Sequence, residues 1–244
     1  KIILRAWATK APSSTLSFYT VSVPQPLDLP AEMLMQQPTM QELVLAIPDA
    51  QIREGALMGL ADFEESGRTF FIEAGIDKAY FHQLRKLADD APGDDEAAAP
   101  KLIDLELDIY NVMTLLRALF NYSVSFSKIR PFLAPAGTVP ISAIEHMRNA
   151  PDIPTATTFL PSVFFEERTP PLSGDELEIA FWTRLHRTAN RVFYTSVLAF
   201  GAVAAFYYIK RVELANLIRI SECIRYGERG DAVRQKLVTL RPTQ

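Results

Sequence analysis

The sequence predicts an all-α protein, and three observations lead to this prediction. Apolar residues recur at steps of three and four through 68–88, 105–120 and 214–224, which is the spacing of one helix face. Hydroxyl residues followed three positions later by glutamate stand where helices can begin. Strand signals are thin: residues 16–23 are rich in β-branched and aromatic side chains, but no paired run with a hairpin turn follows.

Local signals predict where several helices begin and end. Thr39 and Ser173 each precede a glutamate at the third position, so the hydroxyl can accept the amide of that residue while the glutamate reaches back. Pro100 fits the first turn of the helix that follows it. Gly227 is expected to end a long C-terminal helix, and Gly230 to precede a short last one.

Three segments are expected to connect or border the helices. Lys1 to Trp7 has the pattern of the middle of an amphipathic helix, without a cap, an initiator methionine or a signal-peptide pattern, so we expect further sequence before Lys1. The acidic segment 89–96 is broken by proline and glycine and is predicted to be a solvated loop; a contact for a basic partner is the alternative. The proline-rich segment 151–171 is predicted to separate two helical units.

A motif of the form acid–apolar–x–Asn–apolar occurs twice. It occupies residues 108–112 and, 105 residues later, 213–217. The same offset sets Glu73 against Glu178. Self-similarity over such a long period indicates a duplicated architecture, whose units bury their faces against each other.

A third, truncated copy is predicted at the start of the chain. Residues 4–6 match 116–118, and farther along 29–34 matches 139–144. We therefore predict three similar helical units in one compact body. Their predicted bounds are 1–62, which is the tail of the first unit, 63–165 and 166–244.

The composition excludes several classes of protein. The chain has 244 residues, of which 48% are hydrophobic and 22% charged, so it can bury a sizeable core. Its net charge of −4 argues against a nucleic-acid partner, because such binding needs clustered lysine and arginine. The single cysteine, Cys223, excludes an intrachain disulfide and is compatible with a reducing compartment.

Residues 192–209 form an 18-residue run without a charge, flanked by Arg191 and Lys210. A helix of that length spans about 27 Å, near the lower limit for crossing a bilayer. We favour a buried central helix that continues directly into the charged residues 210–227, because the glycine and alanine cluster at 201–205 would let neighbouring helices approach. A single membrane span is the alternative.

Motifs for catalysis or metal binding do not stand out. His82, His146 and His186 have no cysteine or carboxylate at metal-ligand spacing and are predicted to be surface or boundary residues. Cys223 is expected to be a buried, inert thiol. The sequence contains no GxSxG motif, Walker loop or Rossmann fingerprint. We therefore predict a protein that is not an enzyme and that takes no metal, cofactor or small-molecule substrate.

The acid and the asparagine of the repeated motif share one helix face, because they are three residues apart. We expect Asn111 and Asn216 to bond the backbone of a neighbouring loop and so to lock each long helix against its own unit. Contact with a partner protein is the alternative role for this motif, which Asp108 and Glu213 complete.

These residues resemble a known family, the C subunits of the rotary A/V-type ATPases, which are equivalent to the d subunit of the vacuolar ATPase. The C-terminal signature is similar to Glu213-Leu214-Ala215-Asn216-Leu217, preceded by Tyr207-Tyr208 and Lys210. The family's middle unit is resembled by three segments: Asp108-Ile109-Tyr110-Asn111, Leu115-Leu116-Arg117 and Pro135-Ala136-Gly137. Residues Glu73 to Tyr80 resemble the start of that unit, and Gly227 and 233–237 suit the family's final helix.

The chain departs from the family pattern at three positions. Arg211 stands where the family commonly has glutamate, Ile218 where it favours arginine, and Cys223 where it favours glycine. Precise interface residues are therefore not carried over with the resemblance.

The resemblance implies three helical units around a pseudo-threefold axis, forming a funnel. It also implies a peripheral protein on the cytoplasmic face of the membrane, whose partners are the proteolipid ring and the central-shaft subunits. Its implied task is to couple shaft rotation to ring rotation without catalysis. We expect Arg117, Glu213 and Arg219 near such contacts. The alternatives are a single-span membrane protein anchored by 192–209 and an unrelated helical adaptor.

Overall fold

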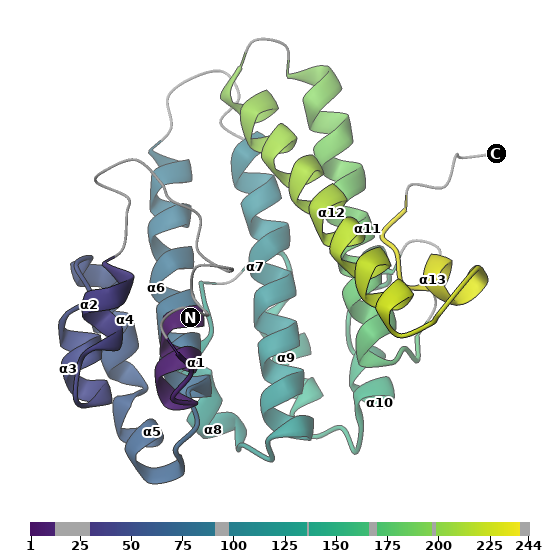
Figure 1. Ribbon diagram of the computed structural model, residues 1–244. Coiled ribbons are helices and arrows are strands. Elements are labelled where there is room, and N and C mark those ends of the chain that lie inside the picture. Colours follow the sequence, from purple (N-terminus) through teal and green to yellow (C-terminus); the bar gives the residue numbers. More distant parts are fainter. Residues whose placement is uncertain (13–29, 91–97, 136, 166–169, 197–198, 240–244) are drawn as a thin grey trace. The chain divides into compact units, whose positions relative to one another are not determined.

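The computed structural model describes residues 1–12, 30–90, 98–135, 137–165, 170–196 and 199–239. Every regular element in these ranges is a helix, which confirms the all-α prediction (Figure 1). The weak strand signal at 16–23 lies outside the described residues. The chain divides into two compact units, Lys1–Gln83 and Leu84–Gln244. The threefold arrangement and the unit bounds at 62 and 165 stay predictions.

The first compact unit is built from short helices and the beginning of a long one. In order they are α1 (Ile2–Ala8), α2 (Ala31–Met35), α3 (Met40–Leu45), α4 (Ala50–Met58), α5 (Leu60–Ser66) and α6 (Phe70–Asp89). The core includes Leu4 of α1, Leu43 of α3 and Ile72 of α6, each no more than 2% exposed. Thr39 caps α3, since its side chain accepts the amide of Glu42.

Helices α4 and α6 cross at a pair of glycines. A Cβ atom built on Gly75 would overlap the carbonyl oxygen of Gly55, and one built on Gly55 would overlap the carbonyl of Gly75. Any side chain at either position would therefore force the two backbones apart. The two glycines determine how closely these helices pack.

The second compact unit holds the three long helices that carry the repeated motif and its companion residues. Its elements are α7 (Ala98–Leu116), the π turn η2 (Arg117–Asn121), α8 (Phe126–Ile129), η3 (Arg130–Phe132), α9 (Ile141–Met147), α10 (Ile153–Thr157), η4 (Ser162–Phe164), α11 (Gly174–Thr195), α12 (Phe200–Arg225) and α13 (Asp231–Gln235). Helix α11 packs against both α12 and α7, and α12 also contacts α7. Consequently α7 is buried on most of its surface, including Leu102, Leu107 and Val112, each 0% exposed.

Several predicted helix ends are confirmed. Ser173 and Glu176 form a reciprocal capping box at the start of α11. Helix α12 ends at Arg225, and Gly227 two residues later has a φ of +77°, a left-handed conformation that glycine adopts without strain. Gly230 precedes α13. The predicted connector 151–171 contains the short helix α10 and the turn η4, while most of the predicted acidic loop lies outside the described residues.

The prediction of one buried helix through 192–209 is wrong. Helix α11 ends at Thr195, where the capping residue Ser196 leaves the helical region with φ −96° and ψ 66°, and α12 begins at Phe200. The uncharged run therefore crosses the end of one helix and the start of the next, and much of it is exposed: Tyr194 is 76% and Val203 64% exposed. Of the helices in the described part of the chain, none is long and apolar enough to cross a membrane.

Candidate functional site

Asn111 and Asn216 make the same two-way hydrogen bond to backbone. The Oδ1 atom of Asn111 accepts the amide of Ala134 at 2.8 Å, and its Nδ2 atom donates to the Ala134 carbonyl at 3.4 Å. Asn216 accepts the amide of Val238 at 3.0 Å and donates to the carbonyl of the same residue at 2.7 Å. Each asparagine thus ties a long helix to the segment that returns 22 or 23 residues later. We call these contacts the asparagine clamps.

The acid of the motif differs between the two copies. Asp108 is 1% exposed and accepts the amides of Thr138 and Val139 at 3.0 and 2.9 Å. Burial raises the pKa of this carboxyl, although its hydrogen bonds act in the opposite direction. Gly137 makes the approach possible, because a Cβ there would overlap the Asp108 carboxylate. Glu213 instead has a side chain that is 51% exposed and pairs with Lys210 at 2.7 Å.

An ion pair also recurs at residues that the sequence repeat aligns. In the first compact unit, Arg5 binds the Glu73 carboxylate, with its Nε atom 2.8 Å from Oε1, and Thr69 donates to the same carboxylate at 2.7 Å. In the second compact unit, Arg117 binds Glu178 at 3.1 Å. In each case an arginine near the end of one helix holds a glutamate in the first two turns of a long helix. The repeat pattern contained these residues, but it gave no sign that they touch.

Two of the three predicted contact residues converge on Glu178. Besides Arg117, the guanidinium of Arg219 lies 3.8 Å from its carboxylate. The side chains of Arg117 and Arg219 are 52% and 25% exposed. Glu213 is not part of this junction. A role of these residues in binding partner proteins stays a prediction.

A pocket of about 340 Å³ adjoins this junction. Its lining includes Glu178, Arg219, Cys223, Glu228 and Lys236. Cys223 is buried, and burial together with a hydrogen bond to Glu228 raises the pKa of its thiol, so the unreactive protonated form is favoured. Glu228 is bound by Lys236 at 2.6 Å. The pocket therefore offers paired charges rather than an activated nucleophile.

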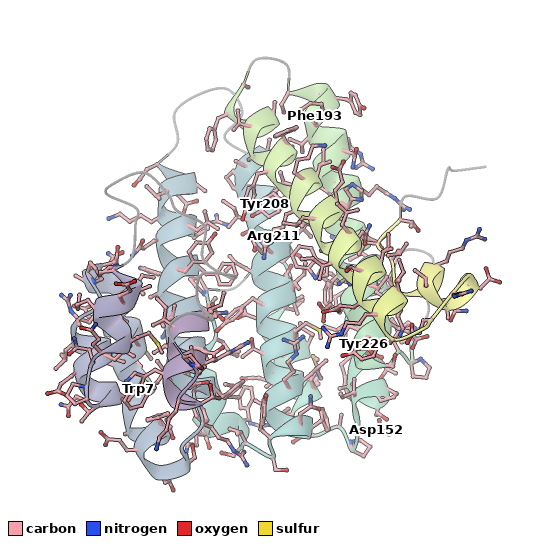
Figure 2. All side chains as sticks on the ribbon, in the orientation of Figure 1. Trp7, Asp152, Phe193, Tyr208, Arg211 and Tyr226 are labelled. Carbon is pink, nitrogen blue, oxygen red and sulfur yellow. The ribbon has the colours of Figure 1, made fainter. Side chains whose placement is uncertain are left out.

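Another polar junction joins α7 to α12. Glu106 is 3% exposed, accepts a hydrogen bond from Tyr208 Oη at 2.6 Å and is ion-paired with Arg211. The guanidinium of Arg211 also lies 5.0 Å above the ring of Trp182 of α11. Figure 2 shows Tyr208 and Arg211 on the stretch of α12 that faces α7. Arg211 therefore neutralises the buried acid Glu106.

The histidines lie apart from these junctions. His82 and His146 are exposed and His186 is half-buried. Burial lowers the pKa of His186, although the nearby charge of Glu213 acts in the opposite direction. Within the described ranges, no three histidine, cysteine or acidic side chains are placed to hold a metal ion together. The polar geometry described above is that of joints between helices.

Comparison with known proteins finds a family match along nearly the whole chain. Residues 1–236 match the family model described as ATP synthase (C/AC39) subunit. A similar protein is the C subunit of the A-type ATP synthase of Pyrococcus abyssi, 25% identical over 223 residues. The alignment covers 84% of this chain and 60% of that relative, so the chain spans less than two thirds of the relative's length. No solved structure matches the chain significantly.

Proposed function

Because the chain belongs to the ATP synthase (C/AC39) subunit family, we propose that it is a non-catalytic coupling subunit of a rotary A/V-type ATPase. In this role it links the central shaft to the membrane proteolipid ring and transmits torque between ATP turnover and ion transport. The observation that carries the proposal is the family match along residues 1–236. The chain would act at the cytoplasmic face of the membrane as a peripheral protein.

The joints between the long helices support a mechanical role. A part that transmits torque must resist being unwound, and close-packed helices are poorly compressible. In this chain the long helices are additionally fixed to their returning segments by the asparagine clamps. The arginine–glutamate pairs fix helix starts, with Glu73 and Glu178 each held from another helix. Load applied to one helix would therefore pass to its neighbours through several polar joints.

The three-unit funnel and its bounds, 1–62, 63–165 and 166–244, belong to this proposal. Two findings support them. The clamp recurs at the two complete copies of the motif, and α2 and α9, which the sequence comparison aligns, both begin directly after a proline, Pro30 and Pro140.

Glu213 is the best-placed of the proposed contact residues. Detachable protein contacts are more polar than obligate ones, and the Glu213 side chain is half exposed on α12. Arg117 presents about half of its side chain in addition to its pair with Glu178, and Arg219 presents less. Charge reversal at Glu213 should therefore affect partner binding more than folding.

Co-elution with purified shaft subunits tests the proposal. We expect the chain to bind the shaft, and Glu213→Lys to weaken that binding about tenfold while the circular dichroism spectrum is unchanged. Asp231→Lys is the matched control, because Asp231 is also an exposed acid paired three residues along its helix. If the parent chain elutes apart from both shaft and ring, the coupling role is wrong, and the unrelated helical adaptor becomes the better interpretation.

A further inference from the structure

Exposed aromatic and aliphatic side chains gather where α11 and α12 meet. We call this group the hairpin tip; its members and their exposed fractions are Phe193 (38%), Tyr194 (76%), Phe200 (58%), Val203 (64%), Phe206 (49%) and Tyr207 (53%). The rings of Phe193 and Phe206, one from each helix, have centroids 6.2 Å apart. Figure 2 shows Phe193 at this end of the hairpin and Tyr226 toward the opposite end of α12. Single apolar residues are ordinary on protein surfaces, but a group of this size marks an interaction site.

The chain segment that contains the hairpin tip carries basic residues and no acidic ones. From Ile179 to Val212 the sequence has no aspartate or glutamate, in a chain whose net charge is −4. Its lysines and arginines are Arg184, Arg187, Arg191, Lys210 and Arg211. The structure uses Arg211 to neutralise Glu106, within the α7–α12 junction. Lys210 lies 5.6 Å from the centre of the Phe206 ring, and its ammonium is paired with Glu213 at 2.7 Å. Arg191, one turn before Tyr194, is exposed and is the cation of this segment that we assign to the contact.

Exposed aromatic side chains next to basic ones suit the interface of a lipid bilayer. Tyrosine and phenylalanine are stable at the boundary between hydrocarbon and headgroups, while arginine and lysine reach back toward phosphate. Each such cation near an anionic leaflet adds attraction of about 1 kcal/mol. An aspartate or glutamate among them would be repelled, and this stretch has neither. Since none of the described helices is a candidate span, the contact would lie in the interface rather than cross the bilayer.

We propose that the hairpin tip docks on the surface of an anionic lipid bilayer. The aromatic rings enter the headgroup region, and the exposed Arg191 faces the lipid phosphates. The contact adds a direct attachment to the membrane, separate from any protein partner. It does not depend on the proposed coupling function, because lipid alone is the ligand.

Flotation with protein-free vesicles tests the docking. We expect the chain to float with phosphatidylcholine vesicles that contain roughly one quarter phosphatidylglycerol, and to bind pure phosphatidylcholine vesicles at least several-fold less. Raising the salt concentration toward 1 M should release it, because screening shortens the reach of the charges to about 3 Å.

Two pairs of variants locate the contact. Tyr194→Ser combined with Phe200→Ser should lower the partition coefficient at least about tenfold, since each removes apolar surface that the bilayer would cover. Leu217→Ser combined with Ile224→Ser is the control, because these residues of α12 are similarly exposed but lie beyond the tip. Arg191→Glu should abolish the preference for anionic vesicles, whereas Arg225→Glu at the far end of α12 should leave it intact.

The depth to which the hairpin tip enters the bilayer is measured separately with Tyr194→Trp and Tyr226→Trp. We expect brominated lipids to quench the added fluorescence at position 194 and not at 226, over the background of Trp7 and Trp182. The proposal is overturned if the parent chain ignores both kinds of vesicle, or if tip and control variants lose binding equally. If the parent chain does not bind vesicles and the tip variant no longer assembles with shaft or ring subunits, the hairpin tip is a contact for a protein instead.

Discussion

At the scale of single residues, the side-chain amides of Asn111 and Asn216 supply hydrogen bonds to backbone groups of a returning loop. Those groups lie outside a helix and have no helical hydrogen bonds. An amide side chain suits this task, because it donates and accepts at once and so pairs with both groups of one residue's backbone. The buried carboxylate of Asp108 does the same for two amides of the next segment. These contacts explain why a helix carries polar residues on an otherwise buried face.

Replacing Asn111 with alanine should destabilise the protein by about 1–3 kcal/mol, because a buried amide and carbonyl lose their partner. Asn216→Ala should cost less, about 1 kcal/mol, since its bonds are only partly buried and water can replace them. Urea unfolding followed by circular dichroism measures both. If the two variants lose the same free energy of unfolding, burial does not determine how much each asparagine clamp stabilises the protein.

Glu73 should give the first compact unit a pH-dependent stability. Burial raises its pKa, but the hydrogen bonds from Arg5 and Thr69 and the nearby positive charges outweigh this, so the pKa is held below its usual value of 4.5. The folded state therefore binds the proton more weakly than the unfolded state. The stabilisation is present above pH 4.5 and is lost as the pH falls through the lower folded-state pKa.

The variant Glu73→Gln should show this dependence by difference. Near neutral pH it should be less stable than the parent by about 0.5–1 kcal/mol, a modest figure because the Arg5 side chain is 66% exposed. The difference should shrink on acidification below pH 4.5. Arg5→Gln should remove the same pH dependence, measured by urea unfolding at a series of pH values. A difference that grows toward acid would contradict the assigned sign.

At the scale of helices, a few contacts determine how closely two helices pack and which helices are joined. Gly55 and Gly75 allow α4 and α6 to touch through their backbones, and Glu106 with Arg211 joins α7 to α12. Helix propensity alone would favour alanine over glycine by about 1 kcal/mol. Tertiary contact reverses that preference wherever another backbone occupies the space of the Cβ atom.

Gly75→Ala should therefore destabilise the protein by about 1–3 kcal/mol despite its better helix propensity. Gly174→Ala is the matched control in another helix, because its Cβ would meet only the Cδ1 atom of Ile153 at an ordinary 3.8 Å. Thermal unfolding compares the two. If Gly75→Ala is as stable as the parent chain, α4 and α6 can move apart without loss of stability.

Arg211→Ala should cost about 3 kcal/mol or somewhat less, because it leaves the Glu106 carboxylate buried without its cation while part of the arginine site is open to water. The double variant Glu106→Leu with Arg211→Met should recover most of this loss, since it removes both charges together. Urea unfolding of the two variants and the parent tests the pair. If the double variant is less stable than Arg211→Ala, the junction contributes more than charge compensation.

At the scale of the whole molecule, the proposed coupling role makes rigidity a functional property. A rotary complex assembled with the Asn111→Ala chain should still bind shaft and ring, because the clamp is internal. It should nevertheless transport fewer ions for each ATP hydrolysed, since a softer joint lets one end turn without the other. ATPase activity and ion uptake measured on the same proteoliposomes give this ratio. An unchanged ratio in a clearly destabilised variant would argue against torque transmission through these helices.

The sequence by itself determined the helical class, several helix ends and the matched positions of the repeated motif. These properties depend on residues near one another in the chain: the three-to-four spacing of apolar residues, the Ser173 capping box and the glycine at 227. The motif also contained Asn111 and Asn216, whose nearly equal spacing from their loops follows from the repeat.

Tertiary structure decided which of these residues meet and which stay exposed. Arg117 reaches Glu178, and Tyr208 reaches Glu106, across separations that no local pattern encodes. The uncharged run 192–209 shows the limit most clearly. Its composition favoured a buried helix, with a membrane span as the alternative. Hydrophobicity shows that a segment tends to leave water, but it does not show which surface covers that segment. Only the break after Thr195 and the packing of α11 on α12 distinguish them.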